Sequence, residues 1–528
     1  MKRAFAALAV VALTLASPAR AHEEGTKGQL GKVDFANSCS ADVQADLARA
    51  VAILHSFWFS AGEDAFRDVL KKDPECAIAT WGIASIMMNN ALAGQGASPK
   101  GAEIAQAAIE QGRRLGAKTQ RERDYLEAVA AYYADFSNRP ERTRQESRAK
   151  AYEALAQRYP QDDEAQIFYA LYLAATQAQS DQTYAAYRKA AAILEQQFAR
   201  YPDHPGVAHY LIHSYDAAPM AKQGLTAAKR YAGIAPDAPH ALHMPSHIFT
   251  RVGAWEESIA TNRRSAKVAV VGNEADESYH ANDYAVYGLL QLARDDEARK
   301  EIDSAMKVQG ISDRFVPYYA MAAMEARYAM ERGNWKEASA LPVRASKYPF
   351  VDAQTVFARA IGAARSGDVA GAQREADALA TLHKQLQDAK NNYWATEVEV
   401  QRLAAAGWIA LAGKNNDDAL KFMRAAADLE DRNEKHIVTP GRIVPARELL
   451  GDLLMQIGQP AQALKEYEAS QEREPNRFRG LYGAAVAAEA SGDRAKASSY
   501  YARLAEMTRG ASSGRPEMMK LKASLASK

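Results

Sequence analysis

The chain has 528 residues and a formal net charge of +1, with 66 lysines and arginines set against 65 aspartates and glutamates. This near balance argues against nucleic acid or an anionic membrane as the main partner, because both attract clustered positive charge. The chain also exceeds the length at which single hydrophobic cores stop growing, so more than one structural unit is expected.

Residues 1–21 have the pattern of a cleavable secretory signal peptide. Basic residues at positions 2–3 precede an apolar stretch over residues 4–16, and the small-x-small pattern that signal peptidase requires follows at residues 19–21. The stretch is too short to span a membrane, and no later segment approaches that length. We therefore expect a periplasmic or secreted protein without a membrane span, whose mature chain begins at His22.

The chain contains two cysteines, Cys39 and Cys76, both near the start of the expected mature chain. An exported protein folds in an oxidising compartment, where two cysteines in one small region can form a disulfide bond. Two separate buried thiols are the alternative. The sequence does not decide between them, because it carries no geometry.

Helix patterns dominate the sequence, and the alternation typical of strands is nearly absent. Pro202 and Pro236 lie 34 residues apart, and so do His209 and His243. That interval is the length of one tetratricopeptide (TPR) helix–turn–helix unit. Turn glycines that precede the small residues of a second helix mark further units, at Gly253, Gly333, Gly367 and Gly413. We predict an all-α, TPR-like helical-repeat solenoid.

A single unit of this kind exposes an apolar face, so neighbouring units must stack into a superhelix with a long concave surface. The spacing departs from the regular interval around residues 90–120 and 370–400, which indicates irregular units. We therefore predict two TPR-like arrays, an N-terminal one over residues 22–310 and a C-terminal one over residues 311–528. The histidine cluster described next belongs to the N-terminal array.

Six of the eleven histidines fall between residues 204 and 247. His209 and His213 are spaced i, i+4, which places both on one helix face, and His243 and His247 repeat this spacing one unit later. Packed helices lie about 8–10 Å apart, so imidazoles that face each other across two helices can converge on one point. The alternative is a duplication whose histidines only fill space between helices.

A third helix extends the pattern. Alignment of "VGAWEES" with "LARDDEA" matches His280 to His240 and Asp283 to His243. Imidazole nitrogen suits zinc, copper, iron or nickel, and one carboxylate is compatible with each. We predict a transition-metal site, with copper or zinc favoured, whose ligands are His209, His213, His243 and His247, with His280 and Asp283 completing a second position or the outer shell.

Further polar residues near the cluster are candidates for orienting the ligands or for contacting a bound molecule. Carboxylates beside a metal site often hold the free ring nitrogen of a ligating histidine. The candidates near the two histidine pairs are Tyr210, Asp216, His240, Arg251 and Tyr284.

The sequence resembles a large family of bacterial, periplasmic TPR-repeat proteins over nearly its whole length. The resemblance is carried by segments that include "ILHSFWFSAGEDAF" from Ile53, "YPDHPGVAHYLIHSYD" from Tyr201, "APHALHMPSHIFTRVGAW" from Ala238 and "VPARELLGDLL" from Val444. It implies the repeat fold and the location of the site, without implying an activity. It also implies that His55 and Glu448, in the first and last of these segments, join the site.

Three functions remain open. A metal-binding chaperone or buffer needs ligands alone, whereas a metal-dependent enzyme inside the superhelical cavity also needs an open coordination position. The third is a scaffold that binds a peptide, a protein or a small molecule in the concave groove without metal. Zinc metalloproteases carry a glutamate directly after the first histidine of their motif, and the segment "HYLIH" lacks it, which argues against that class.

Overall fold

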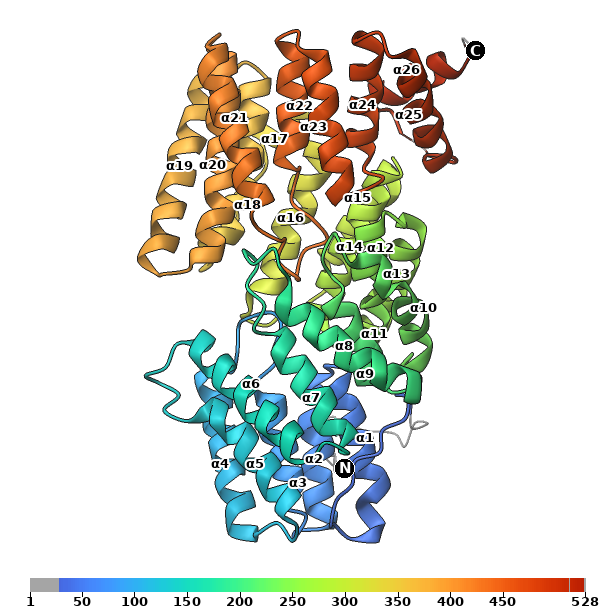
Figure 1. Cartoon of the computed structure of the whole chain (residues 1–528). Coiled ribbons are helices and arrows are strands. Elements are labelled where there is room, and N and C mark those ends of the chain that lie inside the picture. Colours follow the sequence, from blue (N-terminus) through green and yellow to red (C-terminus); the bar gives the residue numbers. More distant parts are fainter. Residues whose placement is uncertain (1–27, 512, 527–528) are drawn as a thin grey trace, which may run out of the picture.

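A computed structural model describes residues 28–511 and 513–526, so the predicted signal peptide lies outside the described residues. All regular structure in the described part is helical, which confirms the predicted all-α, TPR-like solenoid. No helix of this part is both long and apolar enough to cross a membrane. In Figure 1 the N-terminal helices occupy the lower part of the molecule and the C-terminal helices the upper part.

The helices of the first half are η1 (Ala41–Val43), α1 (Gln44–His55), α2 (Phe59–Lys72), α3 (Ile78–Met87), α4 (Pro99–Leu115), α5 (Gln120–Tyr133), α6 (Glu141–Arg158), α7 (Asp163–Ala174), α8 (Ala185–Arg200), α9 (Pro205–Ser214), η2 (Ala221–Gly224), α10 (Leu225–Ile234), α11 (Pro239–His243), α12 (Pro245–Val252) and α13 (Trp255–Val271). Those of the second half are α14 (Ala275–Gln291), α15 (Asp295–Ala305), α16 (Phe315–Glu331), α17 (Trp335–Ser339), α18 (Pro349–Arg365), α19 (Val369–Asp388), α20 (Asn392–Ala412), α21 (Asn416–Asp431), α22 (Ala446–Gln456), α23 (Pro460–Arg473), α24 (Phe478–Ala490), α25 (Arg494–Met507) and α26 (Pro516–Ala526).

Glycines supply the left-handed backbone at the turns inside several helix pairs. Gly253, between α12 and α13, has a φ of 70°, and Gly333 and Gly367 have φ values of 64° and 86° at the equivalent turns. A side chain at such a position would strain the backbone, which explains the recurrence of glycine. At the fourth predicted turn the residue after Gly413 takes this conformation instead, since Lys414 has a φ of 63°.

Buried apolar side chains form three clusters along the solenoid. The largest runs from Leu30 to Phe249, and the second lies mainly between Phe315 and Leu521. A smaller cluster joins helices α13, α14, α15 and α16. This cluster contains residues from both sides of residue 310, so apolar packing is continuous across that position. The division into arrays over residues 22–310 and 311–528 therefore stays a prediction.

The C-terminal half folds back onto the N-terminal half. Helix α24 packs against α14, and Nη1 of Arg477 donates to the hydroxyl of Tyr287 over 2.5 Å. The segment between α21 and α22 descends from the upper part of the molecule towards α14 (Figure 1). It contains no helix, yet every residue from 433 to 441 is buried. We call residues 433–441 the buried loop.

Cys39 and Cys76 form a disulfide bond, with 4.8 Å between their Cα atoms. The bond joins the segment before α1 to the turn before α3. Asp73 lies close to both sulfur atoms, but bonded sulfurs are not thiolate ligands, so this trio is not a metal site. The pairing that the sequence left open is therefore settled in favour of the bond.

Candidate metal centre

Prolines set the start of the helices that carry the histidines. Pro205 begins α9 and Pro239 begins α11, one repeat later, and the fixed φ of proline suits the first turn of a helix. Pro245 begins α12 and therefore separates this helix from α11. The histidines divide among these helices, with His209 and His213 on α9, His240 and His243 on α11, His247 on α12 and His280 on α14.

The first group of histidines consists of His209, His213 and His240, all of them buried. One ring nitrogen of each lies within 4.8 Å of the other two. Nε2 of His209, Nε2 of His240 and both ring nitrogens of His213 have no hydrogen-bond partner among the described residues. Buried polar atoms without partners are unfavourable and uncommon in folded proteins. A metal ion is a partner that these three side chains can share.

Two imidazoles of the first group are oriented through their other nitrogen. Nδ1 of His209 lies 2.7 Å from the backbone oxygen of His55. Nδ1 of His240 lies 3.2 Å from each carboxylate oxygen of Glu277. An oxygen acceptor places the ring proton on Nδ1, so the lone pair resides on Nε2, as in histidines that ligate metals.

The second group consists of His243, His247 and His280, whose ligand nitrogens also lie within 4.8 Å of one another. Nε2 of His243 and Nε2 of His247 face each other at 3.0 Å. Nδ1 of His243 lies 2.7 Å from Oδ1 of Asn262, and Nδ1 of His247 lies 2.8 Å from Oδ2 of Asp216. The Nδ1 atom of each of these two histidines is thus hydrogen-bonded to an oxygen atom.

These contacts fix where the protons of His243 and His247 reside. Nδ2 of Asn262 donates to the backbone oxygen of Ser258 over 2.7 Å, so Oδ1 of the amide accepts from His243. Asp216 as a carboxylate can only accept. Both facing Nε2 atoms therefore carry lone pairs, which repel each other. A metal ion that accepts both lone pairs removes this repulsion, and only a small shift is needed, because two imidazole nitrogens on a tetrahedral zinc ion lie about 3.3 Å apart.

Burial keeps these imidazoles neutral. Desolvation lowers the pKa of His209, His213 and His243 well below the usual histidine range, and neighbouring histidines lower it further. Burial also lowers the pKa of His247, although Asp216 opposes this, and it lowers the pKa of His280 to about 3. Neutral imidazole is the form that ligates metals.

The two groups adjoin. The ring centroids of His213 and His247 are 5.3 Å apart, and those of His240 and His243 are 5.8 Å apart. Six imidazoles therefore form one continuous cluster built from α9, α11, α12 and α14.

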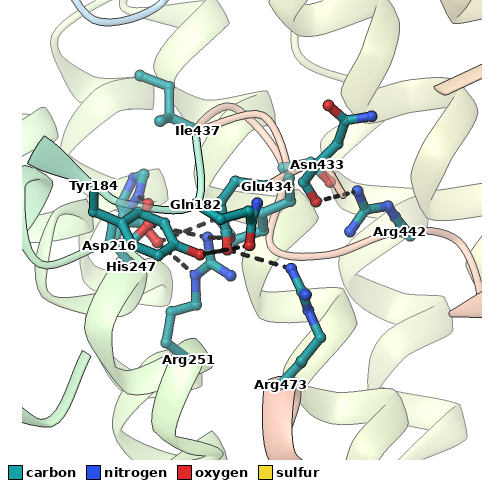
Figure 2. Close-up of polar contacts among 12 residues, drawn as sticks. Gln182, Tyr184, Asp216, His247, Arg251, Asn433, Glu434, Ile437, Arg442 and Arg473 are labelled. Carbon is teal, nitrogen blue, oxygen red and sulfur yellow. Dashed lines mark hydrogen bonds and ion pairs between the residues drawn. The ribbon is translucent and has the colours of Figure 1, made fainter. Parts of the chain in front are cut away.

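The buried loop reaches this cluster through Asp216. Nε of Arg251 donates to Oδ1 of Asp216 over 2.8 Å, and Nη2 of Arg251 lies 3.0 Å from Oε2 of Glu434 in the loop. Figure 2 shows this chain of contacts from His247 through Asp216 and Arg251 to Glu434, which also accepts from Tyr184 over 2.7 Å. Residues from both halves of the chain thus surround the second group.

Asp216 and Lys435 carry opposite charges in a buried setting. Nζ of Lys435 lies 3.5 Å from Oδ1 of Asp216. Burial alone would raise the pKa of Asp216, but Lys435 and Arg251 hold it well below its usual range. Burial lowers the pKa of Lys435 to about 8. Asp216 is therefore a carboxylate that accepts from His247.

A third group, His55, Glu164 and His204, differs from the other two. Glu164 binds Nε2 of His55 and Nε2 of His204, each over 2.9 Å. The remaining nitrogens are also engaged, since Nδ1 of His55 lies 2.9 Å from the hydroxyl of Tyr210 and Nδ1 of His204 accepts from the backbone of Val207. All four ring nitrogens have partners, so this group needs no metal ion and is a buried hydrogen-bonded network.

The structure distributes the predicted site residues differently from the expectation of one four-histidine site. His209 and His213 join His240, which was expected only to support the site, while His243 and His247 join His280. Asp283 lies in neither group, because Nη1 of Arg327 donates to its carboxylate. The tyrosines and His55 lie beside the cluster: Tyr210 contacts His55, and the ring of Tyr284 is 4.7 Å from that of His243.

Glu448 does not join the histidine cluster, contrary to the expectation from the sequence. Its carboxylate accepts from Nε of Arg477 over 2.8 Å, and Arg477 also binds Glu331. Burial raises the pKa of Glu448 to about 7, although Arg477 opposes this. Glu448 on α22 therefore belongs to a buried ion-pair network with Glu331 at the end of α16 and Arg477 directly before α24.

Sequence reasoning missed Glu277, Glu164, Glu434 and Lys435. Glu277 precedes His280 by three residues on α14, a same-face spacing that could have signalled it. Glu164 and the two loop residues had no local signal, since their contacts join segments that are remote in the sequence.

No protein-family model and no curated protein matches the sequence. Among solved structures, the human IFIT1 dimer with PPP-AAAA is similar over 82% of this chain and 91% of that chain, with 11% identity and a TM-score of 0.34. The human IFIT1 dimer with m7Gppp-AAAA is similar over 78% and 87%, with 12% identity and a TM-score of 0.33. Naa15/Naa10 bound to HypK-THB is similar over 91% and 70%, with 15% identity and a TM-score of 0.21. Similarity this low carries no argument about function.

Proposed function

We propose that this protein binds transition-metal ions at two adjoining three-histidine sites enclosed by its TPR-like solenoid. The first site is formed by His209, His213 and His240 and the second by His243, His247 and His280. Copper and zinc are the favoured ions, because imidazole suits both and copper stands highest in the affinity order of divalent ions. Each ion would accept lone pairs from neutral imidazoles that the protein already orients.

The observation that carries this proposal is the 3.0 Å approach of Nε2 of His243 to Nε2 of His247. Asn262 and Asp216 occupy both Nδ1 atoms, so no hydrogen bond between the neutral rings can explain the approach. A proton shared between the rings would place a positive charge in a buried region, which desolvation disfavours. A metal ion satisfies both nitrogens in their neutral form.

A metal-dependent enzyme is the second candidate. Catalytic zinc sites typically have three protein ligands and keep one position for water or substrate, whereas structural sites have four. Each proposed site has three histidines and no carboxylate ligand. This count favours ions with an open position, and therefore exchangeable binding or catalysis, over purely structural ions.

An exported location fits the proposal. The signal-like pattern of residues 1–21 and the bond between Cys39 and Cys76 both suit an oxidising compartment outside the cytoplasm. Mass spectrometry of the protein recovered from that compartment should find a chain that begins at His22. Retention of residues 1–21 in the soluble protein would contradict this location.

Metal analysis of the purified protein and zinc titration of its metal-free form by calorimetry test the proposal. We expect two ions per chain. His209→Ala should abolish one binding event and His243→Ala the other, because each removes a ligand of one site only. His383→Ala on α19 is the matched control, since this ring contacts Glu399 and no other histidine, and it should keep both ions. A wild-type protein that binds neither zinc nor copper would leave the peptide-binding scaffold as the remaining function.

A further inference from the structure

A cavity of about 320 Å³ opens beside the histidine cluster. Its lining includes His240 of the first site and His280 of the second, so ions held at both sites would border it. Phe57, Phe59 and Val316 give it apolar walls. A volume of this size lies at the lower end of those that hold small organic ligands.

The three carboxylates of this cavity have hydrogen-bond partners, whereas its one guanidinium has none among the described residues. Glu274 accepts from Trp58 and Ser60, Asp276 accepts from the backbone and hydroxyl of Ser312, and Glu277 binds His240. Arg314 differs, because its guanidinium makes no hydrogen bond or ion pair with the described residues.

Arg314 stands at the start of α16 and is partly buried in the lining of the cavity. Desolvation lowers its pKa, although Asp276 opposes this. A desolvated guanidinium without a direct partner favours an anion that it can bind through two parallel hydrogen bonds, and a carboxylate matches that geometry.

Metal loading changes the sign of the charge around this cavity. Three carboxylates against one guanidinium make the metal-free lining net negative, which opposes an anion. Two divalent ions at the neighbouring sites would make the surroundings net positive. Anion binding is therefore expected only after the ions are in place.

We infer that this cavity binds a small organic carboxylate with an apolar body, held by Arg314 at its charged end and reaching the ions beside His240 and His280. The inference rests on the proposed metal sites and adds the ligand class that they serve. The carboxylate would occupy the open coordination position of an ion, with the apolar part of the ligand against Phe57 and Phe59.

Calorimetric titration of the zinc-loaded protein with benzoate tests this inference. We expect benzoate to bind, and we expect Arg314→Gln to weaken it about tenfold or more, because a charge-assisted pair is lost. The metal-free protein should also bind benzoate at least about tenfold more weakly. Benzamide, which has the same shape without the charge, should bind weakly to all forms. Arg264→Gln, at an exposed position on α13, is the matched control and should bind benzoate as the wild type does.

A second measurement asks whether the probe reaches the ions. Benzoate should shift the visible absorption band of the Cu(II)-loaded protein, and the shift should be reduced in Arg314→Gln at the same benzoate concentration. Metal-loaded protein that does not bind benzoate, or that binds it equally well in Arg314→Gln, overturns the inference and leaves the metal sites standing. An unchanged copper spectrum in benzoate-saturated protein also overturns it. Protein that takes up no metal overturns the proposed function and this inference together.

Discussion

Oδ2 of Asp216 lies 2.8 Å from Nδ1 of His247, and the side chain of Asp216 is fully buried. Its other carboxylate oxygen binds Arg251 and lies near Lys435 of the buried loop. The carboxylate that orients His247 of the proposed second site is thus itself held by two cations, one from each half of the chain.

Asp216→Asn should selectively weaken the second metal site. The amide no longer favours a proton on Nδ1 of His247 as strongly, and loss of such a partner typically lowers metal affinity about 10–100-fold. Zinc titration should therefore show one weakened and one unchanged binding event. Asp203→Asn, at a half-exposed carboxylate remote from the second group, should change neither event. An equal effect of Asp216→Asn on both events would contradict separate sites.

The metal-free protein should lose stability as the pH falls below about 6.5, the usual pKa of an unfolded histidine. The pKa of His280 is about 3 in the folded protein, so the unfolded state binds more protons between these two values. Stability is therefore present above pH 6.5 and declines as the pH falls through this window, by about 2 kcal/mol at pH 5 from His280 alone.

Urea unfolding at pH 7 and pH 5 measures this decline. His280→Gln removes the titrating group and should show a smaller difference between the two pH values than the wild type. Identical pH dependence in the two proteins would show that His280 does not remain neutral on folding.

Removal of the disulfide bond by the double substitution Cys39→Ser and Cys76→Ser should destabilise the N-terminal helices. The bond closes a loop with a sequence separation of 37 residues, for which loop entropy predicts about 4 kcal/mol. Denaturant unfolding with and without a reducing agent measures the loss. The reducing agent should destabilise the wild type and leave the serine variant unchanged; equal stability of the oxidised and reduced wild type would contradict a stabilising bond.

Arg327→Met should loosen the buried loop. Nη2 of Arg327 donates to Thr439 and to the backbone of Gly441, each over 2.6 Å, and Nη1 binds Asp283. Loss of one partner from a buried ion pair typically destabilises a protein by about 3–5 kcal/mol. Limited proteolysis should then cut within residues 433–441, and chemical unfolding should begin at lower denaturant concentration.

Arg299→Met is the matched control for that experiment. Arg299 pairs with Asp303 on the surface of α15, where such a pair is worth less than about 1 kcal/mol. Its proteolysis pattern should be that of the wild type. Protection of the buried loop in both variants would mean that Arg327 does not secure it.

The repeat fold and the closeness of the two i, i+4 histidine pairs could be predicted because both depend on regular spacing. The 34-residue interval sets the repeat, and the i, i+4 spacing places His209 and His213 on one face of α9. Both intervals relate residues within one helix or in neighbouring units, so they can be read from the sequence alone.

The division of the cluster into two groups could not be predicted in the same way. It depends on which helices lie side by side, because His240 lies with the two histidines of α9, whereas His243 and His247 lie with His280 of α14. The position of Glu448 depends on how the whole superhelix closes, and that follows from small rotations accumulated over many units. For the same reason the contact between Glu434 and Arg251 could not be predicted from the sequence around either residue.

The buried loop has a consequence for the order in which the protein acquires its structure. Tyr184 and Glu434 are hydrogen-bonded across a sequence separation of 250 residues, so the surroundings of the second site are completed only after the C-terminal half has been synthesised and docked. Contacts this distant form slowly, because the intervening chain must first be ordered. Under the proposed function, capture of an ion at the second site is a late event in maturation, and nascent or partly folded chains should not compete for metal with the finished protein.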